Sequence, residues 1–258
     1  MDMFQAVVLG IVEGITEFLP VSSTGHLILA GQLFGFSGGN FEKSFDIIIQ
    51  LGAILSVVVL YWRSLLVDRE TQKKVAVAFL PTAIIGLAFY KVVKTYLLGN
   101  ALVVVASLFV GGIFIILFEK WYTQRPKENT LGEISGMSYK QAVVLGVCQS
   151  VAIIPGVSRS AATILGGLAL GLKRGAIVEF SFLLAVPTML AATSLDLLKN
   201  YGEFSRDQFG ILAVGFFVSF VVALASIKFL LGFVQKYSFT SFGIYRVVAG
   251  LAFWFFVL

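Results

Sequence analysis

Two carboxylates lie four residues apart in an apolar stretch near the start of the chain. Glu13 and Glu17 should share one face of a helix, with Cβ atoms about 5 to 6 Å apart. A carboxylate at the centre of a bilayer costs on the order of 3 kcal/mol, so both should face a hydrated, protein-lined cavity. There the pair could hold a divalent cation, Mg²⁺ or Ca²⁺, or relay a proton or Na⁺. The pair therefore predicts a charged site within apolar sequence.

A polar turn, Pro20–His26, follows the two acids. Its hydroxyl groups belong to Ser22, Ser23 and Thr24, and Gly25 precedes the chain's single histidine, His26. Hydroxyls and the free N–H groups of a following helix start are what an anion such as phosphate requires. We predict that Ser22, Thr24 and Gly25 contact the anion and that His26 is catalytic. A mechanism that needs two histidines is excluded.

A second polar turn carries a positive charge. Arg159 is surrounded by the hydroxyls of Ser158, Ser160 and Thr163. A guanidinium presents a planar fork of donors that fits phosphate oxygens and keeps its charge when partly buried. Together the two turns predict a site for a phosphorylated group, with Ser158, Ser160 and Thr163 binding it. Arg159 could instead pair with Glu13 or Glu17 to hold the turns together, and both roles are compatible.

The nucleophile has two candidates. Ser23 could attack phosphorus with His26, three residues on, as its base, or a water activated by His26 or the metal could attack directly. In either case Arg159, the loop amides and a cation on Glu13 and Glu17 would stabilise the transferred phosphoryl group. We expect Glu17, Ser23, His26 and Arg159 to be catalytic. Asp46 and Gln50 either support the first turn or belong to a solvated helix end.

Composition defines the surroundings of these turns. Hydrophobic residues make up 58% of the 258 residues and charged residues only 13%, whereas charged residues run near a quarter in soluble domains. The chain is therefore predicted to be an all-α integral membrane protein. Runs that approach the roughly 20 residues needed to cross a bilayer predict six spans. They cover residues 47–62, 75–90, 101–118, 176–195, 209–231 and 242–258.

An internal repeat relates the two turns. Residues 5–35 recur as residues 141–171, and both copies open on QAVVLG. Each copy predicts a re-entrant helical hairpin, because irregular backbone at membrane depth is tolerated only where it lines a cavity. The predicted arms are 4–19 and 26–35 around the turn 20–25, and 139–154 and 161–171 around the turn 155–160. In the second copy Gln149 replaces Glu13 and Ile153 replaces Glu17.

Three spans follow each hairpin, so the second copy should have the inverted topology. We expect a single domain over 1–258, with repeat one at 1–120, a linking loop at 121–138 and repeat two at 139–258. Most basic residues outside the spans then fall on one side, which the positive-inside rule makes cytoplasmic, and the mouth of the first hairpin faces outward. The net charge of +5 reflects this asymmetry, so no nucleic-acid partner is expected. The lone Cys148 excludes an intramolecular disulfide.

The two motifs resemble a known family. Glu13-x-x-x-Glu17 followed by PVSSTGH, together with PGVSRSAAT and FDIIIQLGAILSVVV, is similar to bacterial undecaprenyl-diphosphate phosphatases of the bacitracin-resistance type. The resemblance spans essentially the whole chain. It implies hydrolysis of undecaprenyl diphosphate to undecaprenyl phosphate and phosphate in the bacterial inner membrane, which recycles the lipid carrier of peptidoglycan synthesis. It also implies a divalent cation and a functional core at Glu13, Glu17, Ser23, His26 and Arg159.

The main alternative is a transporter or flippase for a lipid phosphate or an ion. Inverted repeats with broken helices are the architecture of secondary transporters, and carboxylates near the midplane would serve ion coupling there. The expected partners are a polyprenyl diphosphate and membrane lipid, and a homodimer stays open. The hydroxyl-rich first turn and Arg159 favour the enzyme.

Overall fold

The structure is a computed structural model that describes every residue except 37–38, 98–99, 125–131, 201–207 and 258. The described residues form helices and no strand, so the all-α prediction is confirmed. The first half contains α1 (Met3–Thr16), α2 (Ser23–Leu33), α3 (Asn40–Leu60), α4 (Trp62–Leu66), α5 (Arg69–Val92), a π-helical turn (Val93–Leu97) and α6 (Ala101–Thr123). The second half contains α7 (Tyr139–Ser150), α8 (Arg159–Ala169), α9 (Arg174–Asn200), α10 (Phe209–Lys236) and α11 (Thr240–Val257), with 3₁₀ turns at Ile134–Gly136 and Val151–Ile153.

Five of the described helices are long and apolar enough to cross a membrane. They lie at Phe41–Leu60, Arg69–Val92, Ala101–Thr123, Arg174–Ser194 and Phe209–Lys236. The sixth predicted span corresponds to α11, a shorter apolar helix over Thr240–Phe255. Large apolar side chains such as Ile84, Phe217 and Phe255 are more than half exposed on these helices, as lipid contact would require. The chain is therefore a multi-pass membrane protein.

The second span begins before its apolar run. We predicted residues 75–90, whereas α5 starts at Arg69 because Asp68 caps it and accepts hydrogen bonds from the backbone N–H groups of Glu70 and Thr71. An N-cap carboxylate satisfies helix N–H groups that otherwise lack partners, so the helix extends into polar sequence. The apolar periodicity alone could not show this extension.

The two predicted hairpins correspond to α1–α2 and α7–α8, with shifted boundaries. The returning helices begin at Ser23 and Arg159, earlier than predicted, because Ser22 and Ser158 cap them through their side-chain oxygens. Both capping serines have positive φ, 74° and 77°. A left-handed serine costs free energy, and such residues cluster at functional sites. The entering helices are also shorter: α1 ends at Thr16, and α7 ends at Ser150 before a 3₁₀ turn.

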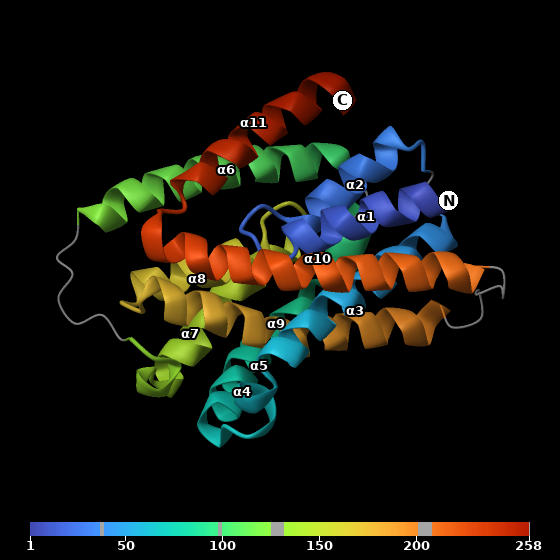
Figure 1. The fold of residues 1–258 in the computed structure, drawn as a ribbon. Helices are drawn as coiled ribbons and strands as arrows, with labels where there is room; N and C mark the ends of the chain where they lie inside the picture. Colours follow the sequence, from blue (N-terminus) through green and yellow to red (C-terminus); the bar gives the residue numbers. More distant parts are fainter. Residues whose placement is uncertain (37–38, 98–99, 125–131, 201–207, 258) are drawn as a thin grey trace.

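The halves show the same order of elements and exchange their packing partners. Each has a helical hairpin followed by three helices that are longer than those of the hairpin. α1 packs against α10 of the second half, and α7 packs against α5 of the first. Figure 1 shows the loop after α1 and the loop before α8 side by side near the centre of the molecule. The opposite orientation of the halves in a membrane stays a prediction.

Small residues allow α1 to lie close to α10. A Cβ at Gly10 would lie 2.9 Å from the carbonyl oxygen of Gly215, and one at Gly14 would lie 2.8 Å from the carbonyl oxygen of Ser219. Glycines four apart on a helix form a flat face, so the two helix backbones can approach each other closely. In lipid, dispersion forces stabilise this close contact. This packing fixes α1, and therefore Glu13 and Glu17 at its end, against the second half.

Candidate active site

The tips of the two hairpins are in direct contact. The hydroxyl of Ser160 donates to the carbonyl oxygen of Leu19 at 2.9 Å, across 141 positions of sequence. Gly25 lies at the same junction, because a Cβ there would be 3.7 Å from the Cα of Gly156 and 3.2 Å from a side-chain carbon of Val104. The structure therefore brings the two polar turns together in one place.

Glu17 joins three parts of this junction. Its Oε1 accepts a hydrogen bond from Nη2 of Arg159 at 2.9 Å, and its Oε2 accepts one from the hydroxyl of Ser23. Arg159 also donates through Nη1 to the carbonyl oxygen of Ser181 in α9, at 2.9 Å. All three side chains of this Glu17–Ser23–Arg159 cluster are largely buried. The guanidinium has five N–H groups, so these two bonds leave donors for a phosphate.

Glu13 is buried without a hydrogen-bond partner. Neither of its carboxylate oxygens is bonded in the structure, and the side chain is fully shielded from solvent. Asp46, Glu17 and Arg159 are near enough to act on it electrostatically, which places Asp46 of α3 close to the site. A buried carboxylate without a partner is costly, and a bound cation would relieve that cost. This orphaned carboxylate fits the predicted divalent cation.

The cation would have few protein ligands. Among the described residues, no group of three or more histidine, cysteine, aspartate or glutamate side chains is arranged for a metal ion. Mg²⁺ commonly binds through one or two carboxylates together with substrate phosphates and water. A site built from Glu13 would be of this kind, and the identity of the cation stays a prediction.

His26 is held by two hydrogen bonds that define its tautomer. Its Nδ1 lies 2.8 Å from the carbonyl oxygen of Ser22, and its Nε2 lies 2.7 Å from the hydroxyl of Tyr245 in α11. A carbonyl can only accept, so Nδ1 carries the proton and, in the neutral ring, Nε2 accepts from the Tyr245 hydroxyl. Ser23 is bonded to Glu17 instead. The geometry therefore favours Glu17 over His26 as the base for Ser23.

The remaining predicted binding residues have mainly local contacts. The hydroxyl oxygens of Ser22 and Ser158 accept from the N–H groups of Gly25 and Ala161 at 3.4 and 3.2 Å, which caps α2 and α8. Thr163 is fully buried and donates to the carbonyl oxygen of Arg159 at 3.0 Å.

Thr24 is partly exposed at the start of α2, where a ligand could reach it. Whether these hydroxyls also bind phosphate stays a prediction.

Sequence reasoning missed Arg246, which is fully buried in α11. Its guanidinium donates to carbonyl oxygens of both turns and of α6 at 2.8 to 3.4 Å. The five acceptors are Pro20, Ser107, Leu108, Gly156 and Val157. An arginine inside an apolar span is the signal that could have revealed it, because such residues are rare and usually functional. Arg246 holds the two hairpin tips in register.

We expect the replacement Arg246→Met to destabilise the protein by about 3 kcal/mol, because removing one partner leaves buried polar groups unsatisfied. Thermal unfolding in detergent measures the loss. Arg63→Met is the control, since Arg63 is exposed on α4 with its guanidinium 5.3 Å from the Trp62 ring centroid. Equal unfolding temperatures for the two variants would contradict the role of Arg246.

Fold and site together define a multi-pass membrane protein that gathers a serine, an arginine and buried acids at two facing hairpin tips. The chain belongs to the bacitracin resistance protein BacA family, whose model matches residues 6–252. It is 51% identical to an undecaprenyl-diphosphatase of Aquifex aeolicus over 98% of both chains, and 48% identical over the full length of both chains to one of Persephonella marina. An undecaprenyl-diphosphatase of Bdellovibrio bacteriovorus is 49% identical over 97% of this chain and 94% of its own.

Proposed function

We propose that this chain hydrolyses undecaprenyl diphosphate to undecaprenyl phosphate and inorganic phosphate. The observation that carries the proposal is the contact of Ser23, Glu17 and Arg159 at the junction of the two hairpins. A hydroxyl nucleophile, its base and a phosphate-binding cation are thereby placed within one buried cluster. The matching undecaprenyl-diphosphatases, similar along nearly the whole chain, support the same activity.

The contacts suggest how phosphoryl transfer would proceed. Oγ of Ser23 attacks the terminal phosphorus while its proton passes to Oε2 of Glu17, the atom to which it is already bonded. The bond from that phosphorus to the bridging oxygen breaks, and undecaprenyl phosphate leaves with the electron pair. Arg159 stabilises the charge that develops on the phosphoryl oxygens. Water then attacks the phosphoserine and passes one proton to a phosphoryl oxygen, the bond from phosphorus to Oγ of Ser23 breaks, and the serine oxygen recovers its proton from Glu17.

Direct attack by water on the same phosphorus would give the same products without a phosphoserine. The bond between Ser23 and Glu17 favours the covalent route, because it supplies a base already in place for the serine. In the direct route, Glu17 would instead accept the proton of the attacking water. The two routes differ in how much they need the Ser23 hydroxyl.

Glu13 is the residue best suited to hold a divalent cation, Mg²⁺ or Ca²⁺. Both oxygens of Glu17 are engaged by Ser23 and Arg159, whereas both oxygens of Glu13 are without partners. A cation there would neutralise charge on the diphosphate as it binds. The predicted shared metal role of Glu13 and Glu17 is then divided, with Glu13 as the principal ligand and Glu17 as the proton acceptor.

Glu13→Gln tests this division. We expect the cation concentration for half-maximal activity to rise on the order of tenfold or more, since metal affinity depends on a charged ligand. The measurement is phosphate release against Mg²⁺ or Ca²⁺ after treatment with a chelator, with the exposed Glu133→Gln as control. An unchanged cation dependence in Glu13→Gln would exclude Glu13 as the ligand.

The transporter alternative is less well supported, because the matching relatives carry the name of a phosphatase. Purified protein in detergent separates the two classes, since an enzyme releases phosphate from undecaprenyl diphosphate without a membrane to cross and a transporter does not. Release that depends on the protein supports the phosphatase, and no release with any divalent cation rejects it.

We also propose that the protein lies in the inner membrane with its site open outward, as the distribution of basic residues suggests.

A further inference from the structure

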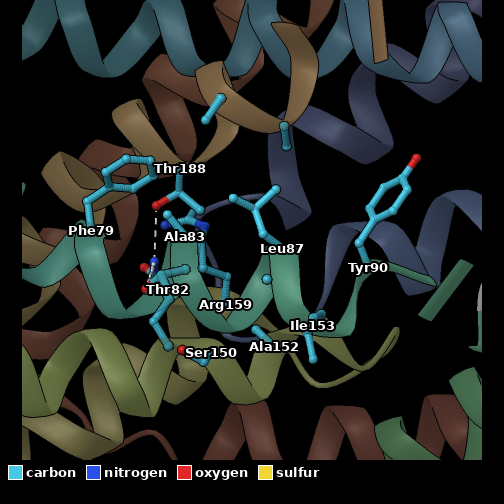
Figure 2. A pocket seen from close by; sticks show the side chains of 14 residues that line it. Phe79, Thr82, Ala83, Leu87, Tyr90, Ser150, Ala152, Ile153, Arg159 and Thr188 are labelled. Carbon is cyan, nitrogen blue, oxygen red and sulfur yellow. Dashed lines mark hydrogen bonds between the residues drawn. The ribbon is translucent and has the colours of Figure 1, made fainter. Parts of the chain in front are cut away.

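A cavity of about 460 Å³ adjoins the Glu17–Ser23–Arg159 cluster on the side of α5, α7 and α9. Apolar and small side chains dominate its walls, including Phe79, Gly86 and Leu87 of α5, Ile153 after α7 and Ala192 of α9. Figure 2 shows Phe79 and Tyr90 at opposite ends of the pocket and Arg159 between them. The same guanidinium therefore faces both the cavity and Glu17.

Several polar groups of the cavity wall are hydrogen-bonded to one another. Gln149, the counterpart of Glu13 in the second repeat, donates to the hydroxyls of Thr82 and Thr188 at 3.1 and 3.0 Å and accepts from Thr163 at 3.3 Å. Its amide is thus fully engaged within the protein. Arg159 is the charged residue among those that line the cavity. Its guanidinium has five N–H groups and keeps donors for a ligand. The cavity therefore offers one cationic group in a wall that is otherwise mainly apolar.

The rim of the cavity reaches the lipid-facing surface. Leu87 lines the cavity and is 64% exposed, and Ile84 on the same helix is 66% exposed. Ala83, Gly86, Ala191 and Ala192 leave the space between α5 and α9 open because their side chains are small or absent. A long apolar chain could pass from the cavity into the bilayer without crossing water.

From this arrangement we propose that the chamber between α5 and α9 binds the phosphate-proximal end of the substrate's prenyl chain. The inference rests on the proposed function, because Arg159 in the cavity wall must hold the diphosphate. A cavity of about 460 Å³ is in the size range of pockets that bind drug-sized ligands, so it has room for the first few isoprene units but not for the whole chain. The rest of the chain lies in the bilayer. Apolar burial of the first units supplies affinity that the diphosphate alone does not.

The substitution Gly86→Leu tests the chamber directly. Gly86 lines the cavity, and a Cβ there meets nothing within 4 Å, so a leucine side chain has open space at its start and should extend into the cavity. Gly232→Leu is the matched control, because Gly232 in α10 also has open space around it and lies outside the cavity. Both proteins are assayed for phosphate release from undecaprenyl, farnesyl and isopentenyl diphosphates, at one detergent concentration.

We expect Gly86→Leu to raise KM for the undecaprenyl and farnesyl substrates by about tenfold, in the range that a filled apolar pocket commonly produces, with kcat unchanged. KM for the one-unit substrate should stay unchanged, and Gly232→Leu should match wild type throughout. In wild type, the affinity should rise more steeply from isopentenyl to farnesyl diphosphate than from farnesyl to undecaprenyl diphosphate.

Two outcomes would overturn the chamber while leaving the proposed function intact. One is an unchanged KM for the long substrates in Gly86→Leu, and the other is an equal loss on all three substrates. A photoreactive farnesyl diphosphate provides a second readout, because it should label peptides of α5 and α9 and should lose that labelling in Gly86→Leu. A wild-type protein that releases phosphate from none of the three substrates would instead reject the proposed function.

Discussion

Ser23→Ala lowers the turnover of undecaprenyl diphosphate on the order of 10⁴-fold if Ser23 is the nucleophile, since removing a covalent nucleophile leaves only binding and electrostatic stabilisation. Ser23 is suited to this role because its hydroxyl donates a hydrogen bond to Oε2 of Glu17, which can accept its proton. Phosphate release by purified protein at saturating substrate measures the effect. KM should change little, because the hydroxyl acts on the transition state more than on binding.

The control for Ser23→Ala is Ser226→Ala. Ser226 is also buried, and its hydroxyl donates to a helix carbonyl, that of Val222, at 3.0 Å, away from the hairpin tips. Its loss should leave turnover at the wild-type level. If Ser23→Ala keeps most of its turnover in a folded protein, the covalent route is wrong and water attacks phosphorus directly.

Arg159→Ala should lower turnover on the order of 10³-fold under either route, because the phosphoryl group would lose its main protein cation. Arg159→Lys should recover only part of that loss. A single ammonium group cannot reproduce the planar fork that reaches both Glu17 and the carbonyl oxygen of Ser181. Turnover of both variants, beside the exposed Arg63→Ala, measures the effect. Wild-type turnover in Arg159→Ala would contradict any role of Arg159 in catalysis.

The site was predictable where polar residues interrupt apolar sequence. Such interruptions are costly in lipid, so VSSTGH and PGVSRS marked the hairpin tips, and the repeat indicated that the two tips belong together. The helix boundaries were less predictable. Ser22 and Ser158 take up the capping positions of the returning helices in a left-handed conformation that no periodicity reveals.

The partners of individual side chains were not predictable from spacing. Ser23 and His26 lie three residues apart at the start of α2, yet Ser23 bonds to Glu17 and His26 to Tyr245, 219 positions away. Long-range packing of α11 decides the second contact, and the sequence offers no local signal for it. The buried Arg246 beside Tyr245 was visible as a charge in an apolar run, but its five carbonyl partners come from three distant segments.

A double-mutant cycle between Glu17 and Arg159 tests most directly whether the two hairpins form one catalytic site. Turnover of undecaprenyl diphosphate is measured for wild type, Glu17→Gln, Arg159→Ala and the double variant. Residues that act as one unit are strongly non-additive, so the double variant should lose little more than the worse single variant. Losses that multiply would show that the two residues act independently, and would contradict a single site shared by the two hairpin tips.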